Sequence, residues 1–475
     1  MQGGKLMKID VAGGPATTLV SGSVGAYGGA WNQEGVILFV KDLHLFRVAA
    51  AGGTPSPVTE LDKSREEVVH AAPAFLPDGR HFLYVVFNLS DLDYTACVGD
   101  LQSKDKKLLV QRLNSHVTYV DPGYLLFARD HVLMAQPFDA GKLQTMGDAV
   151  PVVEEVDTAG RSRYYSASPN GTLAYASGGA GTGLQITWYD RSGKVVGTVG
   201  KPVEIQTPRL SPNGKIVASD RVDTQTRRRD IWLTDLVRGG EQRLTFAGQN
   251  SFPVWSPDSL RVAYFHADQN GEKVLVKSAD GTGQPEVLES PIKRPMDWTR
   301  DGRYLILATS LATPKTSSDL WALPLSGANP AGKPVPLRET EFAEWHGRVS
   351  PDGRWLAYDS DDTKRREVYV VGFSSLNGHW QVSVDGARDP VWSRDGRELY
   401  FVGLNGKMMA VEIEPGPQFE ASVPKPLFDV RLGAAINFPS YDVSADGRFL
   451  IATRVEQTAT VPMTVMLNWQ APLKK

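Results

Sequence analysis

Alternating apolar runs recur along the chain, and each follows a short turn-forming phrase. In the best copies an apolar or aromatic residue precedes Ser-Pro, then Asp or Asn, Gly, and Arg or Lys, as at 349–354. Asp-Gly or Asn-Gly between two apolar runs predicts a β-hairpin, because the turn needs a positive φ that Gly adopts freely and Asn or Asp tolerates. Pro before the turn excludes a continuing helix or central strand. Each phrase therefore predicts two antiparallel strands joined by a tight turn.

The phrase returns at a regular interval. Clear copies lie at 74–80, 210–215, 255–258, 298–303, 349–354, 392–397 and 443–448, and weaker copies lie at 31–35, 120–123 and 167–171. The Asp or Asn of the turn gives the interval between consecutive copies. It is Asn170, Asn213, Asp258, Asp301, Asp352, Asp395 and Asp446 in turn, and the intervals are 43, 45, 43, 51, 43 and 51 residues. This period is that of a four-stranded propeller blade of about 40–45 residues. The two longest intervals predict loop insertions.

Each repeat offers two further strands after its hairpin. Residues 230–233 and 367–370 have the pattern of third strands, and 242–245 that of a fourth. The sequence has no sustained helical period. A single blade carries apolar residues on both faces, and only a neighbour on each side removes them from water. We therefore expect an all-β protein of about ten stacked antiparallel blades, that is, β-propeller architecture.

The repeats divide into a regular set and a degenerate set. Residues 205–475 hold the six strongest repeats and predict one closed six-bladed propeller. Its last blade is expected to combine two strands around Asp446-Gly447, a third at Val465-Met466-Leu467, and a ring-closing strand near 194–197. Residues 1–204 hold about four and a half weaker blades and predict an incomplete propeller. The alternative is a seven-bladed C-terminal ring that begins near residue 160.

Several phrases carry a closer resemblance. The Ser-Pro-Asp-Gly-Arg copies resemble the TolB-like, WD-type propeller repeats of bacteria. The whole chain, from residue 5 to residue 475, is similar to the C-terminal sensor region of membrane-anchored, eukaryotic-like bacterial serine/threonine kinases. The phrases that support this closer match are 81–84, 123–127, 133–139, 229–233 and 467–469. The resemblance implies a binding role outside the cytoplasmic membrane, in a periplasmic or other extracytoplasmic location.

The kinase part of that family has no counterpart in this sequence. It lacks a Gly-x-Gly-x-x-Gly loop before a strand Lys, a His-Arg-Asp motif and an Asp-Phe-Gly motif, so kinase activity is not expected. The chain also begins inside a repeat, because 5–10 and 17–20 resemble third and fourth strands without the first two. We therefore expect a shortened first propeller and an N-terminal unit less stable than 205–475.

Composition and charge argue against several kinds of partner. The 51 Lys and Arg against 54 Asp and Glu argue against nucleic acid, whose phosphates require clustered basic residues. The basic run 227–229 precedes Asp230 and is expected to be a solvated loop. No window approaches the roughly 18 apolar residues of a membrane span, and the first residues lack the pattern of a signal peptide. The single Cys97 excludes an intrachain disulfide and a cysteine metal cluster. The oligomeric state stays open.

No pattern predicts a catalytic residue, a cofactor site or a metal site. The histidines lack the spacing of paired metal ligands and are expected as polar residues of loops or strand ends: His44, His70, His81, His116, His131, His266, His346 and His379. The acidic stretch 359–362 lacks the twelve-residue calcium loop and is expected to be solvated. A Gly-x-Ser-x-Gly elbow is also missing.

Two repeated residue types could be mistaken for functional groups. Trp255, Trp298 and Trp392 occupy one fixed place immediately before the turn, which predicts a shared packing role. The recurrent acidic residues are expected to form turns through side-chain hydrogen bonds to the backbone: Asp78, Asp258, Asp301, Asp352, Asp395 and Asp446.

The leading functional hypothesis is a non-catalytic binding or sensor module for a protein, peptide or envelope ligand. Propellers present loops and a channel mouth on a rigid scaffold, and recognition residues usually lie on such loops. The alternative is a propeller enzyme, glycosidase-like or lactonase-like, with carboxylates at the channel. Carboxylates that lie far apart in the sequence leave this alternative open.

Overall fold

The fold was analysed in a computed structural model of the chain. It describes residues 5–21, 24–62, 65, 67–88, 94–113, 115–129, 132–154, 156, 165–168, 170–176, 183–223, 228–268, 270–309, 318–325, 333–363, 365–373, 375–430, 432, 439–455 and 463–474. Outside the described residues lie 1–4 of the expected N-terminal segment, His131, Pro169 of one weak repeat, and Arg227 of the basic run.

Almost every element of the described residues is a β-strand. The exception is the 3-10 helix η2 (Ala471–Lys474), and the strands form eleven antiparallel sheets. This confirms the expected all-β fold of mostly four-stranded blades. The chain divides into two compact units, 1–180 with 457–475, and 181–456. We call them the N-terminal unit and the ring, and their bounds differ from the expected 1–204 and 205–475.

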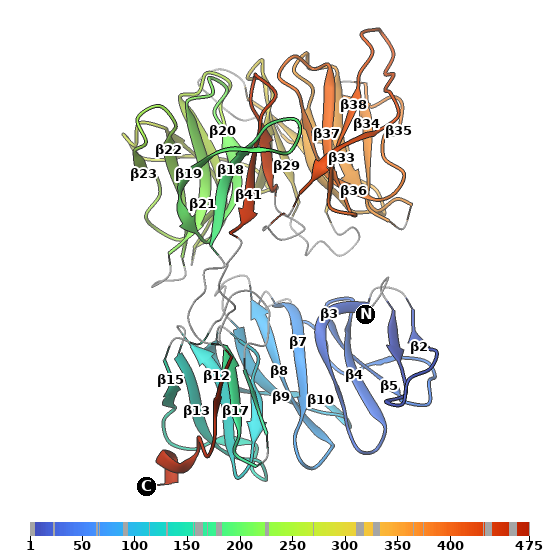
Figure 1. Ribbon diagram of the computed structural model, residues 1–475, viewed down its shortest axis with the longest axis vertical. Helices are drawn as coiled ribbons and strands as arrows, with labels where there is room; N and C mark the ends of the chain where they lie inside the picture. The colour runs from blue at the N-terminus through green and yellow to red at the C-terminus, as the bar shows by residue number, and fades with distance from the viewer. Residues whose placement is uncertain are drawn as a thin grey trace. The chain divides into compact units, whose positions relative to one another are not determined.

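The ring contains six four-stranded sheets, numbered here as blades one to six (Figure 1). Blade one consists of β20 (Ile205–Leu210), β21 (Ile216–Val222), β22 (Arg229–Asp235) and β23 (Glu241–Arg243), and blade two of β24 (Gln249–Trp255), β25 (Arg261–Asp268), β26 (Gly271–Ser278) and β27 (Glu286–Leu288). Blade three consists of β28 (Arg294–Trp298), β29 (Tyr304–Ala308), β30 (Leu320–Pro324) and β31 (Val335–Arg338), and blade four of β32 (Glu344–Val349), β33 (Trp355–Ser360), β34 (Glu367–Gly372) and β35 (Trp380–Gln381). Blade five consists of β36 (Ala387–Trp392), β37 (Glu398–Gly403), β38 (Lys407–Glu412) and β39 (Lys425–Asp429), and blade six of β40 (Tyr441–Val443), β41 (Phe449–Arg454), β18 (Leu184–Tyr189) and β19 (Val195–Val203).

Blade six joins the two ends of the ring segment. Strand β41 pairs with β18 from Leu184↔Arg454 to Tyr189↔Phe449, and the two strands lie side by side in Figure 1. The ring-closing strand expected near 194–197 is present as the start of β19, whereas β18 was not expected. The third strand expected here at 465–467 is wrong, because β42 (Met463–Met466) pairs with β17 (Leu173–Ala176) of the N-terminal unit.

Buried apolar clusters close the ring. Each of the six blades shares such a cluster with the blade on either side. Between blades six and one the cluster includes Ile186, Leu450 and Leu210. Covering both faces of every sheet removes its apolar surface from water. The ring is therefore a closed six-bladed propeller. A seven-bladed ring that begins near residue 160 does not form, because β16 and β17, the first two strands after that residue, belong to the N-terminal unit.

The recurring phrase forms the turn between the first and second strands of a blade. In blade five, Asp395 Oδ1 accepts the Ser393 hydroxyl and the Arg397 N–H, at 2.7 and 3.1 Å. The Ser393 Oγ in turn accepts the Glu398 N–H at 2.9 Å. In blades one to four, the Oδ1 of the corresponding Asp or Asn likewise accepts the backbone N–H of the residue two positions later. The expected turn-forming role of these acidic residues is confirmed.

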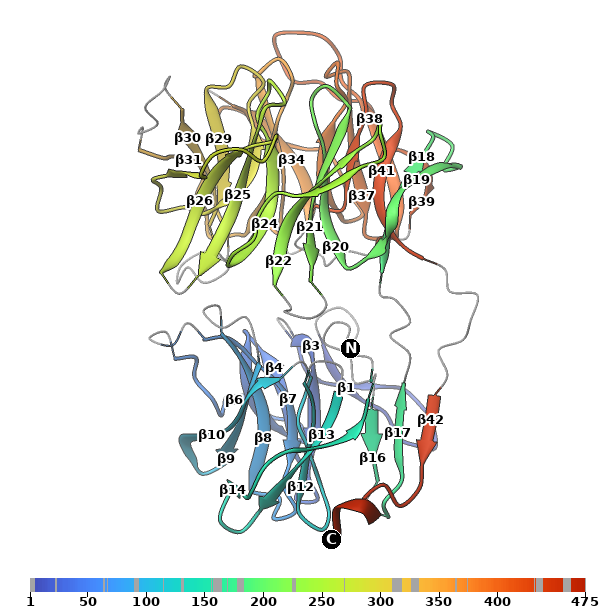
Figure 2. The ribbon, with the colours of Figure 1, turned by 90° about the vertical axis from the view of Figure 1, so that its left-hand side faces the viewer.

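The N-terminal unit is a row of five sheets. Their strands are β1 (Leu6–Lys8) and β2 (Thr17–Val20); β3 (Val24–Trp31), β4 (Val36–Lys41), β5 (His44–Ala49) and β6 (Ser56–Pro57); β7 (Glu67–Phe75), β8 (His81–Asn88), β9 (Tyr94–Asp100) and β10 (Ser103–Leu113); β11 (Thr118–Val120), β12 (Tyr124–Arg129), β13 (Val132–Asp139), β14 (Gln144–Thr145) and β15 (Val150–Val153); β16 (Tyr165–Ala167), β17 and β42. Figure 2 shows β42, from the far end of the chain, beside β17.

The row of sheets in the N-terminal unit is open. Buried clusters join each sheet to the next, but among the described residues none joins the fifth sheet to the first. Apolar side chains are exposed at both ends of the row, Ile9 near β1 by 61% and Met463 and Val465 of β42 by 73% and 58%. The expected incomplete N-terminal propeller agrees with this arrangement.

Limited proteolysis should cut the N-terminal unit first. An end sheet covered on one face only loses fewer apolar contacts when it opens, so local unfolding there costs less free energy than in the ring. We expect early fragments to end within 5–176, while a core covering 183–455 persists, as read by mass spectrometry. Early accumulation of fragments cut within the ring would contradict this expectation.

Ring closure should depend on the buried face of β18. Replacing Ile186, which is 2% exposed, by Asp places a carboxylate between blades six and one and should lower the free energy of unfolding of the ring by about 3 kcal/mol or more. The matched variant Val196→Asp changes a side chain that is 47% exposed and should cost less than about 0.5 kcal/mol. Urea titration followed by circular dichroism measures both, and equal midpoints would refute the closing role.

Candidate functional site

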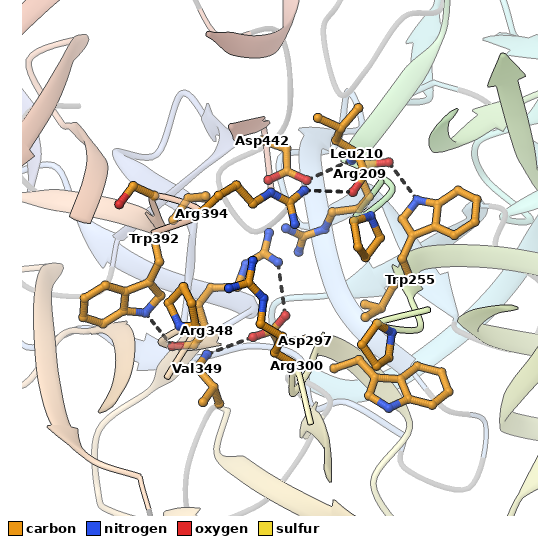
Figure 3. A pocket seen from close by; sticks show the side chains of 17 residues that line it. Arg209, Leu210, Trp255, Asp297, Arg300, Arg348, Val349, Trp392, Arg394 and Asp442 are labelled. Atoms are coloured by element: carbon orange, nitrogen blue, oxygen red, sulfur yellow. Dashed lines mark hydrogen bonds and ion pairs between the residues drawn. The ribbon is translucent and has the colours of Figure 1, made fainter. Parts of the chain in front are cut away.

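The first strand of each ring blade sends one side chain toward a common cavity. The cavity has a volume of about 150 Å³, and Figure 3 shows the side chains that surround it. Two residues before the Ser or Thr of each turn phrase, the chain places in blade order Arg209, Val254, Asp297, Arg348, Val391 and Asp442. The strand pairing is irregular just before this position in the first five blades. A bulge re-aims the side chains that follow it, and Thr207, Phe252, His346 and Asp389 have positive φ there.

The six cavity residues follow a two-fold order around the ring. Blades one and four carry Arg209 and Arg348, blades two and five carry Val, and blades three and six carry Asp297 and Asp442. The hydrogen bonds follow the same order. Asp297 Oδ2 accepts the Val349 N–H of blade four, and Asp442 Oδ2 accepts the Leu210 N–H of blade one, both at 2.8 Å. Each carboxylate therefore links its blade to the next.

Two tryptophans also form hydrogen bonds between neighbouring blades, at equivalent places on opposite sides of the ring. Trp255 Nε1 donates to Arg209 O, and Trp392 Nε1 donates to Arg348 O, both at 3.0 Å. Trp255, Trp298 and Trp392 are all buried, so the expected packing role is confirmed. Their ring edges nevertheless line the cavity, and this contact was not expected from the sequence.

Four guanidinium groups surround the cavity. Two are Arg209 and Arg348, and the other two are Arg300 and Arg394. Arg300 and Arg394 lie in the turns of blades three and five, at the position of the turn phrase that Pro occupies in blades one, two and four. Arg348 Nη1 lies 3.5 Å from Asp297 Oδ1, and Arg394 Nη2 donates to Leu210 O at 3.4 Å. With four cationic and two anionic groups, the cavity has a net positive charge. Charge of one sign in a recess attracts ions of the other sign.

Two of these guanidinium groups have unused donors. Arg209 Nη1 and Arg348 Nη2 are buried and lack a hydrogen-bond partner among the described residues. Arg209 is only 4% exposed, and its Nη2 donates to Met296 O at 3.2 Å. A buried charged donor without a partner costs free energy that an acceptor in the cavity would restore. Arg209 and Arg348 therefore line the cavity with part of their hydrogen-bonding capacity unmet.

The Asp297 carboxyl responds to this environment. Burial raises its pKa to about 7, although the Val349 N–H and the Arg209 guanidinium act in the opposite direction, and the Asp442 carboxylate adds to the rise. Asp297 therefore changes charge near neutral pH, and the net positive charge of the cavity increases when it is protonated.

A second polar cluster corrects two sequence expectations. Asp359 is fully buried in β33 and is not part of a solvated loop. Its Oδ1 lies 2.9 Å from His346 Nδ1, and its Oδ2 pairs with Arg366. Burial acts to raise the pKa of Asp359, but Arg366 and His346 outweigh it and hold the pKa below its usual value. A buried carboxylate with two partners of this kind is best read as structural.

The opposite blade carries an equivalent pair. Asp220 of β21 is buried, accepts the Thr207 hydroxyl, and lies with its Oδ2 3.0 Å from Arg229 Nη1. Arg229 of the basic run is thus an ion-pair partner and not a solvated loop residue. His70, His266 and His346 lie within strands β7, β25 and β32 and are buried. His116 lies in a loop, as expected, and is also buried. Among the described residues, no group of three or more His, Cys, Asp or Glu side chains is placed to hold a metal ion.

Comparisons with known proteins bear on the fold. No family model matches the sequence, and no curated protein matches it. Among solved structures, the chain resembles a putative TolB from Agrobacterium tumefaciens, with 15% identity and a TM-score of 0.45 over 58% of this chain and 99% of that one. It also resembles TolB from Acinetobacter baumannii, with 15% identity and a TM-score of 0.39 over 66% and 81%. The tricorn protease gives 12% identity and a TM-score of 0.37 over 86% of this chain and 45% of that one.

At identities of 12–15% and TM-scores below 0.5, these resemblances extend to the general fold alone. The propeller assignment for the ring stands on its own strand pairing and blade contacts. No helix in the described part of the chain is long and apolar enough to cross a membrane.

Asp297 should make ring stability depend on pH. Its pKa rises from 3.8 to about 7 on folding, so the stability contributed by the protonated form is complete below about pH 4 and is lost as the pH rises toward 7. Asp297→Asn cannot ionise. We expect this variant to match the wild type near pH 4 and to exceed it at pH 8, by on the order of 2–4 kcal/mol.

Urea unfolding of the ring at several pH values measures this difference. Asp395→Asn provides a contrast of opposite sign, because hydrogen bonds from Ser393 and Arg397 lower the pKa of Asp395. That variant should lose stability relative to the wild type as the pH rises above about 4. A difference between Asp297→Asn and wild type that is constant with pH would rule out the raised pKa.

Proposed function

We propose that the ring is a non-catalytic binding module that takes a protein or peptide ligand at the mouth of its channel. The observation that carries this proposal is the cavity bounded by Arg209, Arg300, Arg348 and Arg394, two of which have a buried guanidinium donor without a partner among the described residues. Rigid blades hold these groups in place, and the turns that supply Arg300 and Arg394 vary in sequence from blade to blade. A fixed scaffold with variable turns is the usual arrangement for recognition by propellers.

The sensor role and the location belong to the same proposal. The ordered sequence phrases resemble the propeller region that follows the kinase domain of membrane-anchored bacterial kinases, and this resemblance supports a sensor or partner-binding role in the periplasm or another extracytoplasmic space. Nucleic acid is a poor candidate ligand, because the chain has a formal net charge of -3 and the basic groups converge on a small cavity instead of spreading along a surface.

A photo-crosslinking side chain at position 300 tests the proposal. Arg300 is exposed and lines the cavity, whereas Arg303, three residues later, is exposed but pairs with Asp301 outside it. We expect a crosslinker at 300, incubated with a cell-envelope extract of the source bacterium, to give a discrete protein or peptide adduct that the same group at 303 does not give. Identical adduct patterns from the two positions, or none from either, would count against ligand binding at the channel mouth.

An enzyme of glycosidase-like or lactonase-like type is the second candidate. The observation in its favour is a pair of carboxylates in one cavity, of which Asp297 has a pKa raised by burial to about 7. A carboxylic acid and a carboxylate are the usual pair for glycoside cleavage. Both groups, however, accept backbone N–H bonds that link neighbouring blades. Hydrolysis of an aryl glycoside or a lactone that disappears in Asp442→Asn would favour this second function.

A further inference from the structure

We infer that the channel-mouth cavity recognises a carboxylate of an acidic peptide, held between Arg209 and Arg348 on opposite blades. This inference rests on the proposed binding function and names the chemical group that the site takes. The group is either the side chain of Asp or Glu or a free C-terminus, since both present the same two oxygens.

The donors are the first argument. Arg209 Nη1 and Arg348 Nη2 are buried and unpartnered among the described residues, and they belong to equivalent positions of blades one and four. In a ring of six blades these positions face each other across the channel. The two oxygens of one carboxylate can each accept from one guanidinium, and hydrogen bonds between ionised groups are the strong ones. A neutral amide would offer one acceptor only and would place an N–H against a cation.

The surrounding charges favour an anionic group. Asp297 and Asp442 leave only part of the cationic charge uncompensated, and each is occupied in a bond to a neighbouring blade. Arg300 and Arg394 lie at the turns and are less buried than Arg209, so they can attract an anion toward the buried pair. This steering by exposed charges is expected to weaken with salt.

The size of the cavity limits what enters. A volume of about 150 Å³ admits a carboxylate with a few methylene groups, since one water molecule occupies about 30 Å³ of liquid. The remaining walls are apolar and rigid, formed by Trp255, Trp298, Trp392 and the turn prolines. Such walls favour the methylene groups of a peptide side chain or terminal residue over a fully hydrated inorganic anion.

Four probes separate the possible sources of the anion. They are acetyl-Ala-Ala-Glu-amide, acetyl-Ala-Ala-Gln-amide, acetyl-Ala-Ala-Ala with a free C-terminus, and inorganic phosphate. Binding to the full chain is measured by calorimetry and by the fluorescence of the cavity tryptophans. We expect the Glu peptide, the free C-terminus or both to bind, and the Gln amide to bind at least about 10-fold more weakly, because it lacks the charged hydrogen bonds.

Variants then assign the binding to the arginine pair. Arg209→Gln and Arg348→Gln should each weaken carboxylate binding by about 10-fold or more, and Arg348→Lys should restore part of it because it keeps the charge without the paired donors. Arg303→Gln removes an exposed arginine outside the cavity and should leave binding unchanged. If either buried variant fails to fold by urea titration, Arg300→Gln, which changes an exposed group at the entrance, replaces it and should still weaken binding measurably.

Three results would overturn the inference. These are equal binding of the Glu and Gln peptides, binding of phosphate alone, and carboxylate binding that survives loss of the arginines. None of these results depends on the crosslinking experiment. A ligand captured at position 300 but insensitive to Arg209→Gln and Arg348→Gln would preserve the proposed function and refute the carboxylate clamp. Carboxylate binding without any captured macromolecule would support carboxylate recognition by the two arginines and count against the proposed protein or peptide ligand.

Discussion

Lateral coverage of each blade is the constraint on which the structure depends. A four-stranded sheet with apolar side chains on both faces is stable only where neighbours exclude water from both. In the ring this condition is met all the way round, because β18 and β19 return to complete the blade that β40 and β41 begin. In the N-terminal unit the condition is met for the inner sheets, while the end sheets keep exposed apolar residues such as Ile9 and Val465.

Closure of the ring also creates the site. Six first strands meet at one axis only when the ring is complete, and the bulge before Arg209, Arg348 and their counterparts then aims the side chains into one cavity. Asp297 and Asp442 connect this geometry to stability, since each links two blades through a backbone N–H. The site is therefore a property of the assembled ring and not of any single repeat.

The sequence predicted the features that repeat and missed those that do not. The turn phrase gave the hairpins, the blade period and the roles of Trp392 and Asp395, because one local interaction recurs in each blade. The turn phrase did not predict strand β18, because the apolar run at 184–189 has no turn phrase before it. Burial of Asp359 was also missed, since its partners His346 and Arg366 come from other strands. Arg209 and Arg348 had a usable signal, their fixed place two residues before Ser211 and Ser350, but only the folded ring shows that these positions converge.

The pairing of β17 with β42 has a consequence for synthesis. Ala174 pairs with Val465, and the whole ring segment lies between them in the chain. On the ribosome, β18 leaves the tunnel first and waits for β41, so the ring can close as soon as residues near 454 emerge. The fifth sheet of the N-terminal unit must wait longer, with one edge of β17 unpaired, until β42 has been made. Domains usually complete folding in the order in which they are made, whereas here the part made first is the last to be finished. An unpaired strand edge is a place where another chain can add, so during this interval the edge of β17 is open to association with other chains.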